Sequence, residues 1–313
     1  MSGKCYRFFS RREALGLVGA TGVTAGLWGS FASGESAGAR ASRELEVRLA
    51  KASIVEGAET EGLVSAVADG PPPVLRLRRN TPFKIGVTNR LDDYTSMHWH
   101  GLRVENAMDG VPYLTQFPIG KDQRFQYEMT SPDAGTFWYH PHCMTMEQMA
   151  LGFTGILIVE EDDDPGFLPI NLRDFRLDGQ GRWLELWTAR GAARSGTFGT
   201  VITANWQVEP TYEAPAGGLV RLRIAATDTT RIYRVFFPDA DGRLIAIDGH
   251  PLPAPVDIPK TEETALHLGP GQRADIVVRM PVSEGQSITL MTDAPGAARI
   301  LANIRSIGST LDR

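Results

Sequence analysis

Cysteine is scarce in this 313-residue chain, which contains only two. Cys5 lies in an N-terminal stretch with the character of a removable leader, so Cys143 alone would remain in the mature protein. A single thiol cannot form an internal disulfide, and a disulfide-stabilised framework is therefore excluded. Cys143 directly follows a histidine pair, which admits a metal-ligand role, but a free cysteine is more often a small, partly buried thiol.

An excess of positive charge is also missing. The whole chain has a formal net charge of −5, and loss of residues 1–41, with five basic and two acidic residues, would bring it to −8. An acidic surface without a basic patch disfavours nucleic acid and anionic lipid as partners. No second long apolar run follows residue 41, so the mature protein is expected to be soluble.

Residues 1–41 have the order of an export signal. A basic start is followed by an apolar run rich in Gly and Thr at 14–32, and then by small residues at 37–41. The stretch 10–15 resembles a twin-arginine signal, which implies the twin-arginine translocase as a partner during export. A periplasmic or exported protein is therefore expected. The alternative is an uncleaved membrane anchor, for which the Gly and Thr content of the run is unfavourable.

Histidine is almost as scarce, yet four of the six histidines form two pairs, His98 with His100 and His140 with His142. Both pairs lie in aromatic, strand-like stretches, so the two rings of each pair are expected on one face. If the strands are neighbours, four imidazoles form one patch suited to copper, zinc, iron or nickel. Ligands spread over two strands fit more than one metal better than a closed zinc tetrahedron. The alternative is a pair of buried strands whose histidines are satisfied by hydrogen bonds.

The body of the chain has the pattern of an all-β protein. Short segments with alternating or β-branched side chains are separated by turns rich in Gly, Pro and Asp, which predicts β-sandwiches with Greek-key connections. An acidic stretch at 160–166 reads as a linker between a first unit, 42–164, and a second unit, 165–313. Because 81–89 resembles 218–226, the two units are expected to be copies of one sandwich. The predicted strands span 45–55, 74–78, 83–89, 125–129, 136–142 and 155–160, and then 169–175, 183–187, 220–225, 233–237, 244–248, 265–268 and 275–279.

Several motifs resemble those of the multicopper oxidases, which are built from cupredoxin domains. They read HWHGL at 98–102, MDGVP at 108–112, TQFPI at 115–119, GTFWYHPH at 135–142, DGHPL at 248–252 and LGPGQRAD at 268–275. The resemblance implies two cupredoxin-like Greek-key β-sandwich domains, with copper as the cofactor. It further implies that His98 is a ligand of the type 2 copper, and that His100, His140 and His142 are ligands of the type 3 pair. Asp109 matches an acidic residue that could relay protons to the cluster, although Asp-Gly is also a common turn dipeptide.

The family's other copper ligands do not occur in this sequence. They form a His-x-x-His-x-His stretch and a His-Cys-His stretch, whereas the only histidines after His142 are His250 and His267, which are expected at the surface or rim. The type 1 copper site and half of the trinuclear ligands are therefore missing. Three explanations stay open: a truncated or split oxidase, a third cupredoxin domain supplied in trans, and a descendant that is no longer an oxidase.

The sequence therefore predicts copper binding within a multicopper-oxidase framework. With a third domain, the expected reaction is oxidation of a small reducing substrate coupled to reduction of dioxygen to water. Without it, no oxidase turnover is expected. The alternative function is that of an exported copper-binding or structural cupredoxin scaffold.

Overall fold

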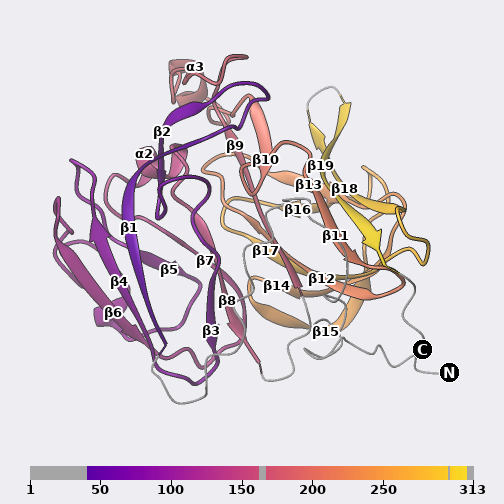
Figure 1. Cartoon of the computed structure of the whole chain (residues 1–313), viewed down its shortest axis with the longest axis horizontal. Coiled ribbons are helices and arrows are strands. Elements are labelled where there is room, and N and C mark those ends of the chain that lie inside the picture. Colours follow the sequence, from indigo (N-terminus) through magenta and orange to yellow (C-terminus); the bar gives the residue numbers. More distant parts are fainter. Residues whose placement is uncertain (1–40, 162–166, 295–296, 309–313) are drawn as a thin grey trace.

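The structure, a computed structural model, describes residues 41–161, 167–294 and 297–308 and confirms the all-β prediction (Figure 1). In these ranges the strands form four sheets, which pack in pairs as two sandwiches. The predicted export signal, apart from Ala41, lies outside the described residues. The predicted boundary between residues 164 and 165 also lies outside them. No described helix is long and apolar enough to cross a membrane.

The first sandwich consists of two sheets with the strand orders β2-β1-β4-β6 and β3-β8-β7-β5. Its core contains Trp99, Phe137 and Ile85, which are fully buried between the two sheets. Its elements are β1 Ala41–Ala52, β2 Thr60–Ser65, β3 Leu75–Arg78, β4 Phe83–Asn89, β5 His98–His100, the 3-10 helix η1 Asn106–Met108, β6 Arg124–Met129, β7 Gly135–His140, α2 Thr145–Ala150 and β8 Gly155–Glu160.

The second sandwich has the strand orders β10-β9-β12-β17-β14-β15 and β11-β19-β18-β13-β16. Its core contains Leu222, Ile276 and Leu290, all fully buried. Its elements are β9 Phe167–Phe175, α3 Ala189–Ala192, β10 Val201–Ala204, β11 Thr211–Pro215, β12 Leu219–Ala226, β13 Tyr233–Phe236, β14 Asp241–Ile247, β15 His250–Asp257, β16 Leu266–Leu268, β17 Arg273–Arg279, β18 Ser287–Ala294 and β19 Ala297–Ile307.

The two sandwiches share one pattern of strand pairing. β4 pairs in parallel with β1 and antiparallel with β6, just as β12 pairs in parallel with β9 and antiparallel with β17. The facing sheets also correspond, because β3 is parallel to β8 and β11 is parallel to β19. The similar stretches 81–89 and 218–226 thus fall on β4 and β12, at the same place in the two sandwiches. The places of β5 and β7 are taken by β13 and β18, which carry no histidine.

The strand predicted at 183–187 is wrong. Trp183 forms only an isolated bridge with Leu177, and the segment belongs to the connection between β9 and β10. Trp183 packs between the two units instead. Trp183 lies against a cluster that includes Leu63 of β2, and its indole Nε1 donates to the backbone carbonyl of Glu61 at 2.7 Å. The strand predicted at 136–142 is also shorter than expected, since β7 ends at His140, immediately before a proline.

Candidate metal centre

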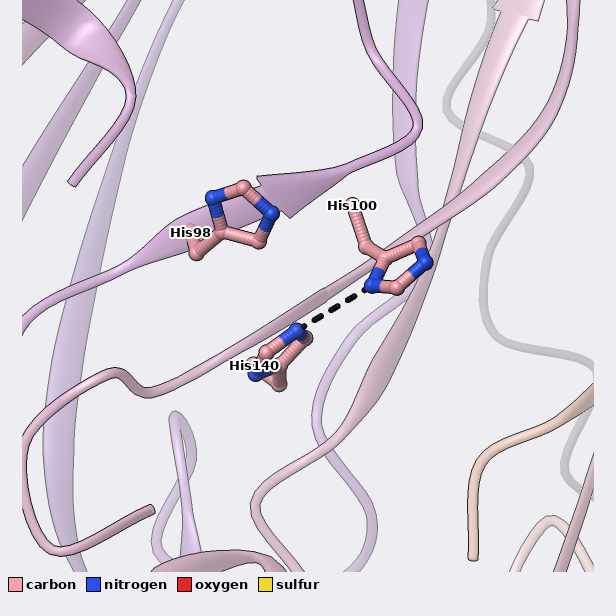
Figure 2. Close-up of side chains that lie close together, drawn as sticks. All are labelled: His98, His100 and His140. Atoms are coloured by element: carbon pink, nitrogen blue, oxygen red, sulfur yellow. Dashed lines mark hydrogen bonds between the residues drawn. The ribbon is translucent and has the colours of Figure 1, made fainter. Parts of the chain in front are cut away.

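The strands that carry the two histidine pairs are antiparallel neighbours. β5 lies at the edge of its sheet beside β7, and their register places His98 directly opposite His140. His100 lies opposite Trp138 on the same face. Three imidazoles from two short strands therefore meet on one side of the sheet (Figure 2).

The imidazoles of His98, His100 and His140 converge. Each ring offers one nitrogen to a group whose atoms all lie within 4.8 Å of one another. The closest approach is between Nδ1 of His100 and Nε2 of His140, at 3.4 Å (Figure 2). Two nitrogens bound to one metal at about 2.0–2.1 Å in a tetrahedral arrangement lie about 3.4 Å apart, so this spacing suits a shared metal ion.

In His98 and His140, a backbone carbonyl determines which ring nitrogen is free to bind a metal. Nδ1 of His98 lies 2.8 Å from the carbonyl oxygen of Asp109, and Nδ1 of His140 lies 3.0 Å from that of Pro141. A carbonyl only accepts, so in each ring Nδ1 carries the proton and Nε2 keeps its lone pair. For His140, that Nε2 atom is the one that faces His100.

The pKa values of His100, His140 and His142 are lowered, which keeps these three rings in the neutral form that binds metals. Burial, together with the neighbouring histidines, lowers the pKa of His140 to about 3. Burial and the positive charge of Arg273 lower the pKa of His100 to about 4. The pKa of His142 is also lowered, chiefly by burial. Neutral imidazole nitrogens with free lone pairs are donors that suit copper, as well as zinc, iron and nickel.

His142 lies in the same patch but in a different arrangement. Its ring stacks on that of His98, with centroids 4.3 Å apart and an interplanar angle of 16°, and it lies 5.2 Å from the ring of His140. It follows Pro141, beyond the end of β7, and its nitrogens are not part of the group of three. The structure therefore brings all four rings into one patch, but only the nitrogens of His98, His100 and His140 converge.

Asp109 lies beside His98, directly after η1. One carboxylate oxygen is 3.3 Å from Nδ1 of His98, and the side chain is about one-third exposed, at 32%. The next residue, Gly110, has a φ of 78°, and a Cβ there would collide with the backbone carbonyl of Met97. The turn is therefore pressed onto the strand that carries His98, which fixes both the carbonyl and the carboxylate of Asp109 at the cluster.

Trp138 is a residue of the site that the sequence argument did not single out. Its ring stacks on His100 and on His140, with centroid distances of 4.6 and 4.4 Å. Strand alternation could have predicted this contact, because Trp138 and His140 are two residues apart and share a face. Gly271 of the second sandwich, which lies against the ring of His100, had no comparable signal in the sequence.

The other candidate metal ligands, His250, His267 and Cys143, are not part of this group. His250 and His267 are exposed in β15 and β16, and Nε2 of His267 accepts a hydrogen bond from Arg234 at 3.1 Å. Cys143 is half-buried, and burial raises the pKa of its thiol. Among the described residues, the only convergent metal-binding group is that of the three histidines.

Comparison with known proteins connects this geometry to copper enzymes. The family model described as multicopper oxidase matches residues 50–164. A multicopper oxidase of Staphylococcus haemolyticus is 28% identical over 230 residues, which cover 70% of this chain and 49% of that protein. The chain spans about half the length of the curated relatives it matches.

Solved structures agree. A multicopper oxidase from Pseudomonas thermotolerans superposes with a TM-score of 0.78 at 35% identity, covering 87% of this chain and 65% of that one. Lac15, from a marine microbial metagenome, superposes with a TM-score of 0.73 at 34% identity, covering 87% of this chain and 68% of that one.

Proposed function

This chain belongs to the multicopper oxidase family, and from that premise we propose that its histidine patch holds copper. The observation that carries the proposal is the 3.4 Å approach of His100 Nδ1 to His140 Nε2 between rings that burial keeps neutral. In this proposal His98 serves the type 2 position, and His100, His140 and His142 serve the type 3 pair. The separate placement of His142 supports ligands divided among more than one copper ion.

The proposed reaction is oxidation of a small reducing substrate coupled to reduction of dioxygen to water. Bound copper would supply the electron transfer, and this chain's residues would hold the metal and handle protons. Asp109 is the candidate for proton relay, because its carboxylate lies 3.3 Å from His98 and oxygen reduction consumes protons. The complete reaction also needs the ligands that this sequence lacks, which a third cupredoxin domain would supply in trans.

An exposed apolar surface in the loop that follows Asp109 supports such a partner. Tyr113, Leu114 and Phe117 are 80%, 76% and 83% exposed, in the loop that begins at Asp109. Tyr113 and Phe117 pack edge to face with their ring centroids 6.5 Å apart. We call these three side chains the apolar loop. Adjacent exposed large apolar side chains are typical of a contact surface for another protein.

Export is proposed from residues 1–41. Their order of basic, apolar and small residues, with the twin-arginine-like stretch 10–15, would direct the chain through the twin-arginine translocase to the periplasm or beyond.

A scaffold or copper-binding role without oxidase activity is the second candidate. It is favoured by one observation: beyond His142, the only histidines are the exposed His250 and His267, which lie apart from the convergent group. The two candidates predict different results when a domain with the missing motifs is added. An oxidase would then take up oxygen with a reducing substrate, whereas a scaffold would not.

Copper retained per chain after loading and desalting tests the proposal. We expect retained copper that is lost in His100→Ala and His140→Ala and kept in the matched control His267→Ala, which removes an exposed histidine. A wild-type chain that retains no copper would overturn the proposal. Sustained oxygen uptake by the chain alone would overturn the need for a third domain.

A further inference from the structure

The second sandwich, which contributes no histidine to the patch, nevertheless touches the ring of His100. The contact comes from the turn between β16 and β17, at Gly271, whose φ is 82°. A Cβ at this position would lie 3.4 Å from Cε1 of His100 and 3.4 Å from the ring of Trp138. Those distances are at the close limit of van der Waals contact, so a Cβ here would touch both rings and the backbone of this turn leaves them no room to shift toward it.

Arg273, two residues later, holds that turn against the first sandwich. Its side chain is buried, and its guanidinium donates to the carbonyls of Gly271 at 2.8 Å and Asp248 at 3.0 Å. Its Nε also donates to the carbonyl of Thr136, in β7, at 3.3 Å. One arginine thus joins two turns of the second sandwich to the strand that carries His140.

The same guanidinium reaches the residue that follows His100. Gly101 has a φ of 80°, and a Cβ there would lie 2.5 Å from Nη2 of Arg273. Glycine is therefore required at 101 both for the left-handed backbone and for the close approach of Arg273. The pair formed by Asp248 and Arg273, with 3.2 Å between Oδ1 and Nη1, keeps the guanidinium in place.

We propose that Gly271 and Arg273 are positioning residues for His100, so that the sandwich without copper motifs sets the copper affinity of the patch. The turn limits how far the ring can rotate or withdraw from His140, and Arg273 fixes the turn. Partners that orient a metal ligand typically change metal affinity about 10–100-fold when they are removed. This inference rests on the proposed copper binding and names which further residues control it.

Two alanine variants separate the contact from backbone strain. Gly271→Ala and Gly285→Ala both place alanine at a left-handed position, with φ values of 82° and 84°, but no atom lies within 4 Å of a Cβ at 285. Both variants should lose similar thermal stability, while only Gly271→Ala should weaken copper binding, by about 10-fold or more. Equal copper affinities for the two variants would overturn the proposal.

A second pair tests Arg273. Arg273→Ala should weaken copper binding and alter the electron paramagnetic resonance spectrum of bound Cu²⁺, and Arg273→Lys should restore part of the affinity. The control is Arg231→Ala, which removes another mostly buried arginine of the second sandwich, paired with Asp174 at 2.6 Å. If the two alanine variants bind copper alike, Arg273 acts on stability alone and the proposal is wrong.

Histidine ring signals in the nuclear magnetic resonance spectrum of the copper-free protein test the positioning independently of metal. The His100 signals should shift in Gly271→Ala and stay in place in Gly285→Ala. A wild-type chain without copper affinity would overturn the proposed function, whereas unshifted His100 signals would overturn the positioning role.

Discussion

His100 and His140 meet diagonally across neighbouring strands, with Nδ1 of one ring 3.4 Å from Nε2 of the other. Neither strand could create this approach alone, since alternation places only residues of one strand on a common face. The approach arises because β5 pairs with the end of β7 in a register that places His98 opposite His140 and His100 opposite Trp138. His100 and His140 should therefore contribute more to metal binding than His142, which lies outside the convergent group.

Single-histidine variants should therefore differ in copper binding. His100→Ala and His140→Ala should each lower copper affinity by more than about 100-fold, because loss of an outer partner alone costs about 10–100-fold. His142→Ala should cost less in the isolated chain, and His267→Ala nothing. Competition titration with a copper chelator measures each value. A His142→Ala loss as large as that of His140→Ala would contradict the difference drawn from the geometry.

The copper-free protein should lose stability below about pH 6.5. An unfolded histidine takes up a proton near pH 6.5, whereas the folded protein holds the pKa of His100 at about 4 and that of His140 at about 3. As the pH falls from 6.5 toward those values, the unfolded chain binds more protons than the folded one, and the free energy of unfolding decreases.

Denaturant unfolding at pH 7 and pH 5 measures this loss above the range in which most carboxylates titrate. His140→Phe, which keeps an aromatic ring against Trp138, should show a weaker pH dependence than the wild type. The control His267→Ala should keep the full dependence. An unchanged dependence in His140→Phe would show that His140 is not the group responsible.

Asp109→Asn should separate the two roles of Asp109. The backbone carbonyl that orients His98 remains in this variant, so copper affinity should change by less than about 3-fold, well below the cost of losing an orienting partner. In an assembly that reduces dioxygen, the variant should lower turnover by about 100-fold or more if the carboxylate relays protons. Copper titration and oxygen uptake measure the two effects. Unchanged turnover would reduce Asp109 to a turn residue.

Much of this architecture could be predicted from the sequence because strand alternation is local. The aromatic stretches around His98 and His140, the repeat at 81–89 and 218–226, and the all-β class followed from patterns within single segments. Pro141 marks the limit of that reasoning. It has no N–H group to continue the ladder, so β7 stops at His140 and alternation no longer decides where His142 points.

The contacts between sandwiches could not be predicted in this way. Nothing in the spacing of residues 268–275 indicates that Gly271 lies against His100 or that Arg273 reaches Gly101. The strand predicted at 183–187 failed for the same reason: its aromatic and aliphatic residues are those of a strand, but Trp183 packs across the junction on the first sandwich. Patterns within one segment carry no information about which distant surface covers it.

The buried polar contact at Thr136 should contribute strongly to stability. Its hydroxyl donates to Asp275 at 2.5 Å and accepts from Arg223 at 2.8 Å, which joins β7 to the second sandwich. Thr136→Val removes hydrogen bonds to charged groups and should cost about 1.5–3 kcal/mol. The control Thr203→Val removes one buried hydrogen bond to a backbone carbonyl and should cost about 0.5–1.5 kcal/mol. Equal losses of unfolding free energy in the two variants would show that the contact between β7 and the second sandwich contributes no more than an ordinary buried hydrogen bond.

The apolar loop should matter for association and not for folding. Leu114 and Phe117 are 76% and 83% exposed, so the double variant Leu114→Ser with Phe117→Ser should leave the free energy of unfolding within about 0.5 kcal/mol of the wild type. It should weaken binding of a separately produced cupredoxin domain that carries the His-x-x-His-x-His and His-Cys-His motifs. Truncating a buried anchor typically costs an interface about 2 kcal/mol or more.

Isothermal titration of that domain into the copper-loaded chain measures the effect on association. Ile232→Ser is the matched control, because Ile232 is 58% exposed and belongs to the second sandwich, whereas the apolar loop belongs to the first. Weaker binding in the double variant alone would place the partner on the apolar loop, in the segment that follows Asp109. Equal binding by all three proteins would mean that the partner docks elsewhere, and oxygen reduction at this patch would then lack the ligands it needs.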